Sequence, residues 1–195
     1  GAKFGPNGDS HNHNDTGSIT VYKDGRPFLI DIGVESYTKK TFSPQRYEIW
    51  TMQSAWHNLP TFDGVQQLPG AEYAAREVCT DKNSITGELA GAYPPIPGLT
   101  TYRRSVSVRE QGITLRDETD HPGTVELTLL TEQQPVPAAD GFVVGTLGGI
   151  RFDPDAVTAA VAPVSITDPR LRTAWPETIY KITLHFQKML DLELY

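Results

Sequence analysis

Short runs in which apolar and polar residues alternate recur along most of this chain. Alternation with a period of two is typical of a strand with one buried and one solvent-facing side. The pattern is clearest at 101–108 and 178–186. Further candidate strands lie at 17–22, 27–32, 47–52, 73–78, 85–90, 112–116, 124–130, 142–146 and 149–152. Only 155–162 has a pattern that suggests a helix.

Turn-forming residues separate these candidate strands. Asp24-Gly25 stands between the first two, and this dipeptide supplies the positive φ that a tight hairpin turn needs. The polar stretches 1–16 and 34–46 are predicted to be loops. Many short strands joined by turns predict an all-β fold. We expect a large antiparallel β-sandwich, supersandwich-like and with little helix, formed as a single domain by residues 1–195.

The charge balance narrows the classes of partner. Lys and Arg number 17 against 24 Asp and Glu, a net charge of −7, which argues against nucleic acid as a partner. No apolar run approaches the roughly 18 residues that a membrane-spanning helix needs. An acidic substrate would need a local basic patch. Lys39, Lys40 and Arg46 form such a group in the 34–46 loop, so they are candidate substrate-binding residues.

Several other residue types are expected to be structural. The single cysteine, Cys79, excludes an intramolecular disulfide and is predicted to be half-buried. His121 lies in a turn, and His185 alternates with apolar neighbours so that it faces away from the core. The three tryptophans are dispersed along the chain, and we expect each to pack against the core.

The polar stretch at the start of the chain holds a candidate metal site. His11 and His13 lie two residues apart in it, His57 follows later, and Asp31 is enclosed by the apolar run 28–33. A carboxylate taken out of water needs a partner. Two or three imidazoles and one carboxylate are a common ligand set for zinc. The predicted ligands are His13, Asp31 and His57, with His11 as an alternative or fourth ligand.

The spacing of these residues leaves alternatives open. If Asp24-Gly25 centres the hairpin, Asp31 lies opposite Ser18, and His13 lies on the order of 16 Å further along an extended chain. The segment would have to curl back, which Gly17 would permit. Otherwise these are loop histidines with neighbouring hydrogen-bond partners, and Asp31 caps a turn. A cupin-type site is disfavoured because Gly and Ser occupy the positions where it would need a glutamate.

Several segments in one order carry a resemblance to a known family. They are 8–15, the hairpin from 17 to 33, Tyr37-Thr38, Arg46-Tyr47, 50–54 and His57-Asn58. In these segments the chain resembles the C-terminal β-sandwich region of the heparinase II/III-like polysaccharide lyases. The resemblance is dense over residues 5–65 and diffuse beyond them.

The resemblance implies an activity and roles for the candidate residues. The family cleaves acidic, uronic-acid-containing polysaccharides or oligosaccharides by β-elimination: the carboxylate is neutralised, C5 loses its proton and the glycosidic oxygen leaves. A mainly structural zinc ion would be held by His13, Asp31 and His57. His11 would face the substrate and assist catalysis. The parent protein would be periplasmic or secreted.

The resemblance also implies that part of the catalytic machinery lies elsewhere. In this family the catalytic tyrosine comes from an α/α-toroid domain that precedes the sandwich, and no such helical domain is present in this sequence. We therefore expect the C-terminal module of a larger lyase, inactive in isolation. The alternative is a non-catalytic carbohydrate-binding or structural β-sandwich module.

Overall fold

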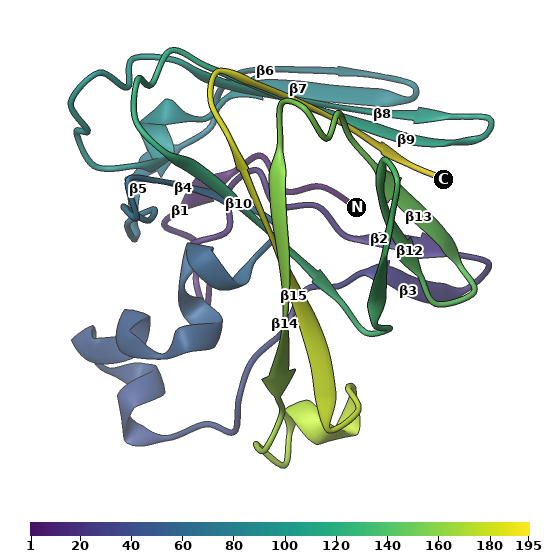
Figure 1. The fold of residues 1–195 in the computed structure, drawn as a ribbon. Helices are drawn as coiled ribbons and strands as arrows, with labels where there is room; N and C mark the ends of the chain where they lie inside the picture. Colours follow the sequence, from purple (N-terminus) through teal and green to yellow (C-terminus); the bar gives the residue numbers. More distant parts are fainter.

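Two antiparallel sheets pack against each other in the computed structural model, which describes residues 1–195 (Figure 1). The larger sheet has eight strands in the order β11-β12-β13-β16-β9-β8-β7-β6. Their bounds are β6 Arg76–Asp81, β7 Ser84–Glu88, β8 Tyr102–Arg109, β9 Gly112–Thr119, β11 Pro135–Ala138, β12 Gly141–Val144, β13 Gly148–Arg151 and β16 Met189–Leu194. The last strand in sequence, β16, thus lies inside the sheet between β13 and β9.

The smaller sheet has four strands in the order β14-β15-β10-β4. They are β14 Thr158–Ser165, β15 Thr178–Phe186, β10 Val125–Thr131 and β4 Pro60–Phe62. Two further pairs complete the strands: β1 Pro6–Asn7 with β5 Gly70–Ala74, and β2 Val21–Lys23 with β3 Arg26–Leu29. The predicted all-β class is therefore confirmed.

Helices are short and all of the 3₁₀ type. They are η1 Lys39–Phe42, η2 Pro44–Glu48, η3 Trp50–Met52, η4 Ser54–Trp56, η5 Ala90–Ala92 and η6 Leu171–Thr173. The first four follow one another and form the lower-left part of the fold in Figure 1. None of these helices has the length or the apolar character to cross a membrane.

The hydrophobic pattern explains how the sheets meet. Leu115, Leu190 and Leu192 on the larger sheet share one core cluster with Ile182 and Leu184 on the smaller sheet. Burying apolar side chains is the main favourable term in folding, at roughly 25 cal/mol per Å². A second cluster gathers six buried residues beneath the loops at the other end: Ile30, Ile32, Leu130, Ile166, Leu171 and Ile179. The second cluster fixes the segment that carries Asp31, because both neighbours of this residue belong to it.

Most predicted strands are present. The hairpin forms as β2 and β3, with Asp24 and Gly25 at φ of 52° and 74° in its turn, as expected. The strand at 178–186 coincides with β15. The strand predicted at 73–78 is divided between β5 and β6. At the other strands, the observed ends differ from the predicted ends by a few residues, because the end of a strand depends on its pairing partner.

Two predicted elements were wrong. Residues 47–52 lie in η2 and η3, because their amides bond three residues back, as from Ile49 N to Arg46 O and Met52 N to Ile49 O. Six alternating residues cannot distinguish this spacing from a strand without a pairing partner. Residues 155–162, predicted as a helix, instead lead into β14, where pairing with β15 outweighs the helix propensity of the alanines.

Cys79 was also predicted wrongly. It is exposed on β6, the outermost strand of the larger sheet, rather than half-buried. Every residue of β6 is exposed. The position of a strand within a sheet is a property of the whole topology, so the local pattern around Cys79 could not predict this exposure.

Candidate functional site

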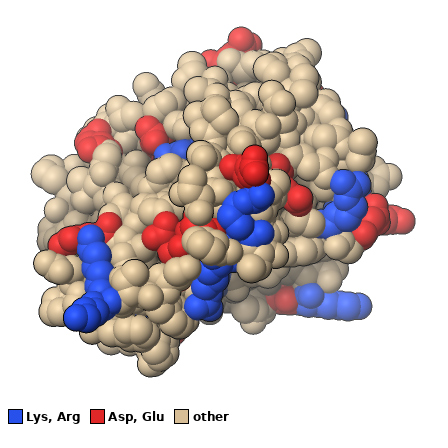
Figure 2. All heavy atoms as spheres, turned by 90° about the horizontal axis from the view of Figure 1, so that it is seen from below, with Lys and Arg blue, Asp and Glu red and all other residues tan.

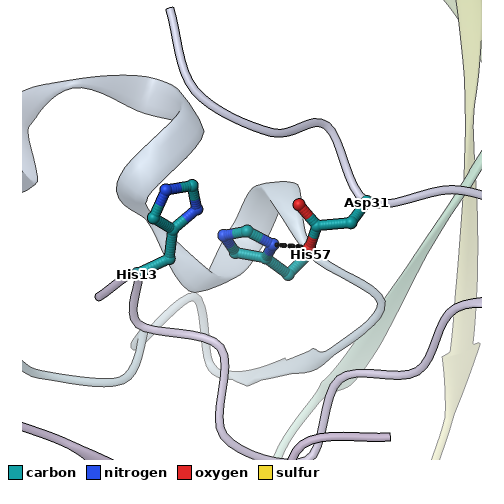
Figure 3. A group of neighbouring side chains, drawn as sticks. All are labelled: His13, Asp31 and His57. Atoms are coloured by element: carbon teal, nitrogen blue, oxygen red, sulfur yellow. Dashed lines mark hydrogen bonds and ion pairs between the residues drawn. The ribbon is translucent and has the colours of Figure 1, made fainter. Parts of the chain in front are cut away.

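The three predicted metal ligands lie together. His13 comes from the first loop, Asp31 from the segment after β3, and His57 from the segment after η4 (Figure 3). Each offers one ligand atom, and these atoms lie within 4.8 Å of one another. The His13 and His57 rings are 5.2 Å apart, centre to centre. Tertiary folding therefore unites residues that are 18 and 26 positions apart in sequence.

Gly17 allows the first loop to curl back towards Asp31. Its φ is +91°, a conformation that side chains rarely adopt. A Cβ atom at this position would lie 2.4 Å from Cδ1 of Leu89. The spacing problem of an extended hairpin is thus solved by a bend that only glycine accommodates.

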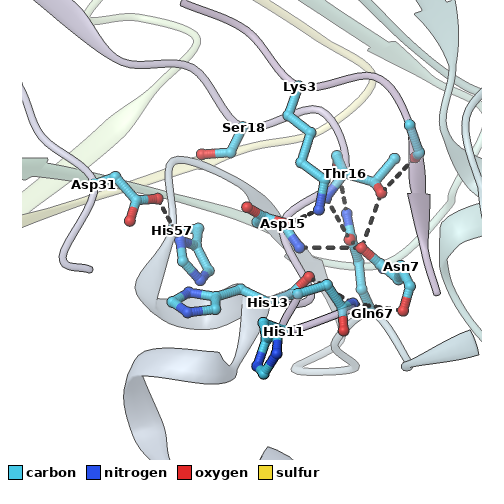
Figure 4. A network of polar contacts seen from close by, with 12 residues as sticks. Lys3, Asn7, His11, His13, Asp15, Thr16, Ser18, Asp31, His57 and Gln67 are labelled. Atoms are coloured by element: carbon cyan, nitrogen blue, oxygen red, sulfur yellow. Dashed lines mark hydrogen bonds and ion pairs between the residues drawn. The ribbon is translucent and has the colours of Figure 1, made fainter. Parts of the chain in front are cut away.

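Buried amides hold the curled loop. The Gln67 side chain accepts from the Thr16 amide at 3.1 Å and donates to its carbonyl at 2.7 Å, while Asn7 donates to the same Gln67 oxygen (Figure 4). Asn12 and Asn14 also donate to backbone carbonyls. Buried hydrogen bonds of this kind favour one conformation of the loop, although Oδ1 of Asn14 is buried without a partner.

A buried ion pair connects this loop to the larger sheet. Arg104 on β8 and Asp117 on β9 are fully buried and pair at 2.7 Å. Nη1 of Arg104 also donates to the carbonyls of Gly17 and Asn58, at 2.9 and 2.7 Å. Asn58 directly follows His57, so one guanidinium contacts the segments that carry two of the three ligands.

Asn58 completes the connection. Its amide donates to the carbonyls of Ile19 and Ile30, and its oxygen accepts from the Leu130 amide at 2.8 Å. These contacts join both sides of the hairpin to β10. The geometry of the candidate site is therefore set by the folded core rather than by the loops alone.

His57 has an unusual hydrogen-bond state. It is fully buried, and its Nδ1 lies 2.8 Å from Oδ2 of Asp31. Its Nε2 is buried without any partner. A buried polar atom without a partner is rare in proteins and often marks a site for an ion or water. This atom supports the interpretation of the group as a metal site.

The ionisation of His13 and Asp31 suits a metal, whereas the raised pKa of His57 means that a metal would have to displace a proton from this ring. Burial, aided by the charge on His57, lowers the pKa of His13 to about 4. Burial alone would raise the pKa of Asp31, but the His57 charge and hydrogen bond outweigh it and lower this pKa to about 2. Burial likewise opposes protonation of His57, yet Asp31 outweighs it and raises the pKa of His57. At neutral pH, His13 is thus neutral and Asp31 ionised, the forms that bind metals.

The group fits zinc in ligand type and approximately in spacing. Two imidazoles and a carboxylate match known zinc ligands, whose donor atoms lie about 3.4 Å apart in a tetrahedral site. The ligand atoms of this group lie within 4.8 Å of one another, a limit wider than that spacing. Asp31 is one-third exposed, so the group is accessible from one side.

His11 lies outside this group. It is not among the three residues whose ligand atoms come together. Its side chain is exposed and its φ is 61°, and Figure 4 draws its ring on the side of His13 away from Asp31. The structure thus separates the two histidines of the H-x-H pair, which leaves His11 free for a different role.

The three basic candidates occupy different environments. Arg46 donates to the backbone carbonyls of His11 and Asn12, at 3.0 Å from its Nη2 to each. Lys40 pairs with Glu48 at 2.9 Å, and Lys39 is exposed. On the face seen in Figure 2, basic and acidic side chains are interspersed and form no continuous basic patch. Substrate binding by these three residues stays a prediction.

Three comparisons place these features among known proteins. Residues 1–162 match the family described as heparinase II/III-like, C-terminal. No curated protein matches. A heparinase III gene product with methylated lysines superposes with a TM-score of 0.72 at 17% identity, covering 99% of this chain and 31% of that chain.

Two more solved structures are similar to this chain in fold. Another structure of that heparinase III gene product gives a TM-score of 0.70 at 18% identity, covering 100% of this chain and 32% of the other. A crystal structure of heparinase III superposes with a TM-score of 0.67 at 21% identity, covering 95% of this chain and 30% of that chain. At these identities the likeness establishes the fold. The chain spans about a third of the length of the structures it matches.

Proposed function

The chain belongs to the heparinase II/III-like C-terminal family, and we propose that it is the C-terminal module of a lyase that cleaves uronic-acid-containing glycans by β-elimination. The observation that carries this proposal is the meeting of His13, Asp31 and His57 beside an exposed histidine. The glycan would be an acidic polysaccharide or oligosaccharide. The parent protein would be periplasmic or secreted.

In this proposal the three ligands hold a structural zinc ion. Zinc would supply a fixed positive charge and join the three segments that carry its ligands. The unpartnered Nε2 of His57 and the neutral state of His13 support it. The surrounding residues already hold the first loop through Arg104 and Gln67, so the ligands are close together before any ion binds.

His11 is the proposed catalytic residue of this module. Its exposed imidazole would contact the substrate carboxylate or take part in proton transfer at C5. Arg46 holds the His11 carbonyl, and so would orient this residue as well as contribute positive charge near the substrate. Lys39 and Lys40 would add charge at the same edge.

The remaining catalytic groups are proposed to lie in a preceding α/α-toroid domain of the parent chain. The residues described here would form a single β-sandwich domain and one wall of the cleft. Proton transfer requires the acid or base within hydrogen-bond reach of its proton. One wall alone cannot meet this requirement.

Metal content is the direct test of the proposed zinc site. We expect elemental analysis of the purified chain to give about one zinc per chain, and the His13→Ala variant to lose it because one of three ligands is gone. His185→Ala is a matched control, since His185 lies on β15 away from the ligand group, and it should keep its zinc. Absence of zinc from the unaltered chain would contradict an occupied site.

Chelation should lower the thermal stability. An ion bound only to the folded state stabilises it by about 4 kcal/mol when its free concentration is a thousandfold above Kd. For a domain of this size, that corresponds to about 8–16 °C in Tm. Scanning calorimetry with and without chelator measures it. Asp31→Ala should remove the response to chelator, and an equal response in that variant would refute the assigned ligands.

The isolated chain should have no lyase activity. Acidic glycans incubated with it should give no rise in the ultraviolet absorbance of unsaturated uronate products, because the remaining acid–base groups are proposed to lie in the preceding domain. Measurable product formation by the pure chain, lost in His11→Ala, would show instead that this module carries a complete catalytic set.

A further inference from the structure

Lys181 is a partly buried lysine of the smaller sheet that has no role in the function proposed so far. It lies in β15, and its side chain is 19% exposed. Its ammonium lies 5.0 Å from the centre of the Trp56 ring and pairs at 3.9 Å with Oε1 of Glu126 on β10. Taking a cation out of water costs free energy unless a partner compensates for it. The electron-rich face of an indole is such a partner.

Trp56 is the last residue of η4 and directly precedes the candidate ligand His57. The amides of these two residues donate to the carbonyls of Gln53 and Ser54, at 3.0 and 3.2 Å. One turn of 3₁₀ helix therefore carries the ring that contacts Lys181 and leads directly into His57. The position of the Trp56 ring on the smaller sheet consequently affects where His57 leaves this helix.

Trp50 links this helix to the segment that carries Asp31. Its ring meets that of Trp56 edge to face, with centres 4.8 Å apart and planes at 80°. Its indole N–H donates to Oε1 of Glu35 at 2.6 Å, and Glu35 follows Asp31 by four residues. The ring also packs against the second core cluster, which holds both neighbours of Asp31. A continuous series of contacts thus runs from Lys181 to the Asp31 segment.

Two sets of contacts therefore hold the His57–Asp31 pair. In the core, Arg104 donates to the Asn58 carbonyl, and Asn58 donates to the carbonyl that precedes Asp31. On the smaller sheet, Lys181 and the two indoles hold the same two segments. Nδ1 of His57 and Oδ2 of Asp31 lie 2.8 Å apart between these sets. Such surrounding contacts raise metal affinity, because ligands that must be ordered on binding lower it.

We propose that Lys181, Trp56 and Trp50 form a positioning cluster that fixes His57 and Asp31 for metal binding. None of the three belongs to the ligand group itself. The cation keeps the Trp56 ring against the sheet, and the Trp50 ring passes this constraint to the segment after β3. This deepens the proposed function and rests on its zinc site.

The zinc affinity of the intact chain, measured by competition with a chromophoric chelator, tests the positioning cluster. Lys181→Met keeps the apolar contacts of the side chain but removes its charge. We expect it to raise the Kd for zinc about three- to tenfold, the effect of losing one cation–π contact. Lys181→Arg keeps a cation over the ring and should restore the Kd to within about twofold. Lys188→Met, which removes an exposed lysine elsewhere, should leave the Kd unchanged.

A double-mutant cycle shows whether the charge acts through the indole. Trp56→Leu alone should weaken zinc binding by at least the same factor as Lys181→Met. In the Trp56→Leu background, Lys181→Met should have no further effect, because the ring that the cation contacts is gone. Trp50→Phe keeps a ring beside Trp56 but loses the bond to Glu35, and it should also weaken zinc binding.

Hydrogen exchange of the chelator-treated chain gives a readout that does not need the metal. In Lys181→Met, the amides of Trp56 and His57 should exchange about three- to tenfold faster, because η4 opens more often. In Lys181→Arg they should exchange as slowly as in the unaltered chain. A lysine that only packs on the sheet surface would change neither this exchange nor the zinc affinity when methionine replaces it.

Two results would overturn the proposal. One is an unchanged Kd for zinc in Lys181→Met while the unaltered chain binds zinc. The other is full additivity of Lys181→Met and Trp56→Leu, which would show that the lysine acts independently of the indole. Absence of zinc from the unaltered chain would refute the zinc site itself, and the positioning role with it, so the two failures are distinguishable.

Discussion

Replacing Arg104 by methionine is expected to lower the free energy of unfolding by about 3–5 kcal/mol. The substitution keeps most of the side-chain volume but leaves the Asp117 carboxylate buried without a cation. It also removes the donor that the Gly17 and Asn58 carbonyls share. Urea unfolding of both proteins measures the difference. The same loss of unfolding free energy corresponds to a fall of about 6–20 °C in Tm.

The exposed pair Arg116–Asp191 provides the matched control. Its side chains are about half exposed, and such pairs contribute about 0–1 kcal/mol. Arg116→Met should therefore have little effect. Arg104→Met combined with Asp117→Leu should recover part of the loss, because no unpaired charge remains. Equal small effects at both arginines would show that the buried pair does not anchor the fold.

The second large effect concerns His11 in the full-length parent enzyme. We expect His11→Asn to lower kcat by about 10²–10⁴-fold, the usual contribution of a positioned acid–base group. Asparagine tolerates the positive φ at this position, so the backbone is not strained. The exposed side chain lies outside the ligand group, so Tm should change little.

Steady-state kinetics measures the expected fall in kcat, and calorimetry of the same preparation measures the expected small change in Tm. His185→Asn is the control, because it replaces a partly exposed histidine on β15. Unchanged turnover in His11→Asn would favour the alternative of a non-catalytic carbohydrate-binding or structural module. Loss of zinc in the same variant would instead make His11 a ligand.

The fold class could be predicted from the sequence because it depends on strong local signals. Alternation over nine residues predicts β15, and Asp24-Gly25 predicts the hairpin turn. The ligand group was predicted from residue chemistry and from the resemblance to the family. Its spacing argued for separation, and the bend at Gly17 that overcomes it is a tertiary feature.

Other parts depend on contacts that a local pattern does not contain. The burial of Arg104 was not predicted, although this residue stands between Tyr102 and Val106 at the inward positions of an alternating strand. That register was the available signal for a buried charge. Gln67 and Tyr47, which hold Thr16 and Asn12, have no such signal. The strand β11 was missed because its four residues include two prolines and it is defined by its pairing with β12. The strand β16 was missed although apolar and polar residues alternate from 190 to 194, so the sequence did contain a signal for it.

The place of β16 has a consequence for the order in which the molecule assembles. A ribosome makes the N-terminal residues first, so the two halves of the larger sheet exist before the strand that joins them. Until residues 189–194 emerge, β9 and β13 expose edges that attract other chains. His13, Asp31 and His57 are all made much earlier, so a nascent chain carries the metal ligands well before its largest sheet can close.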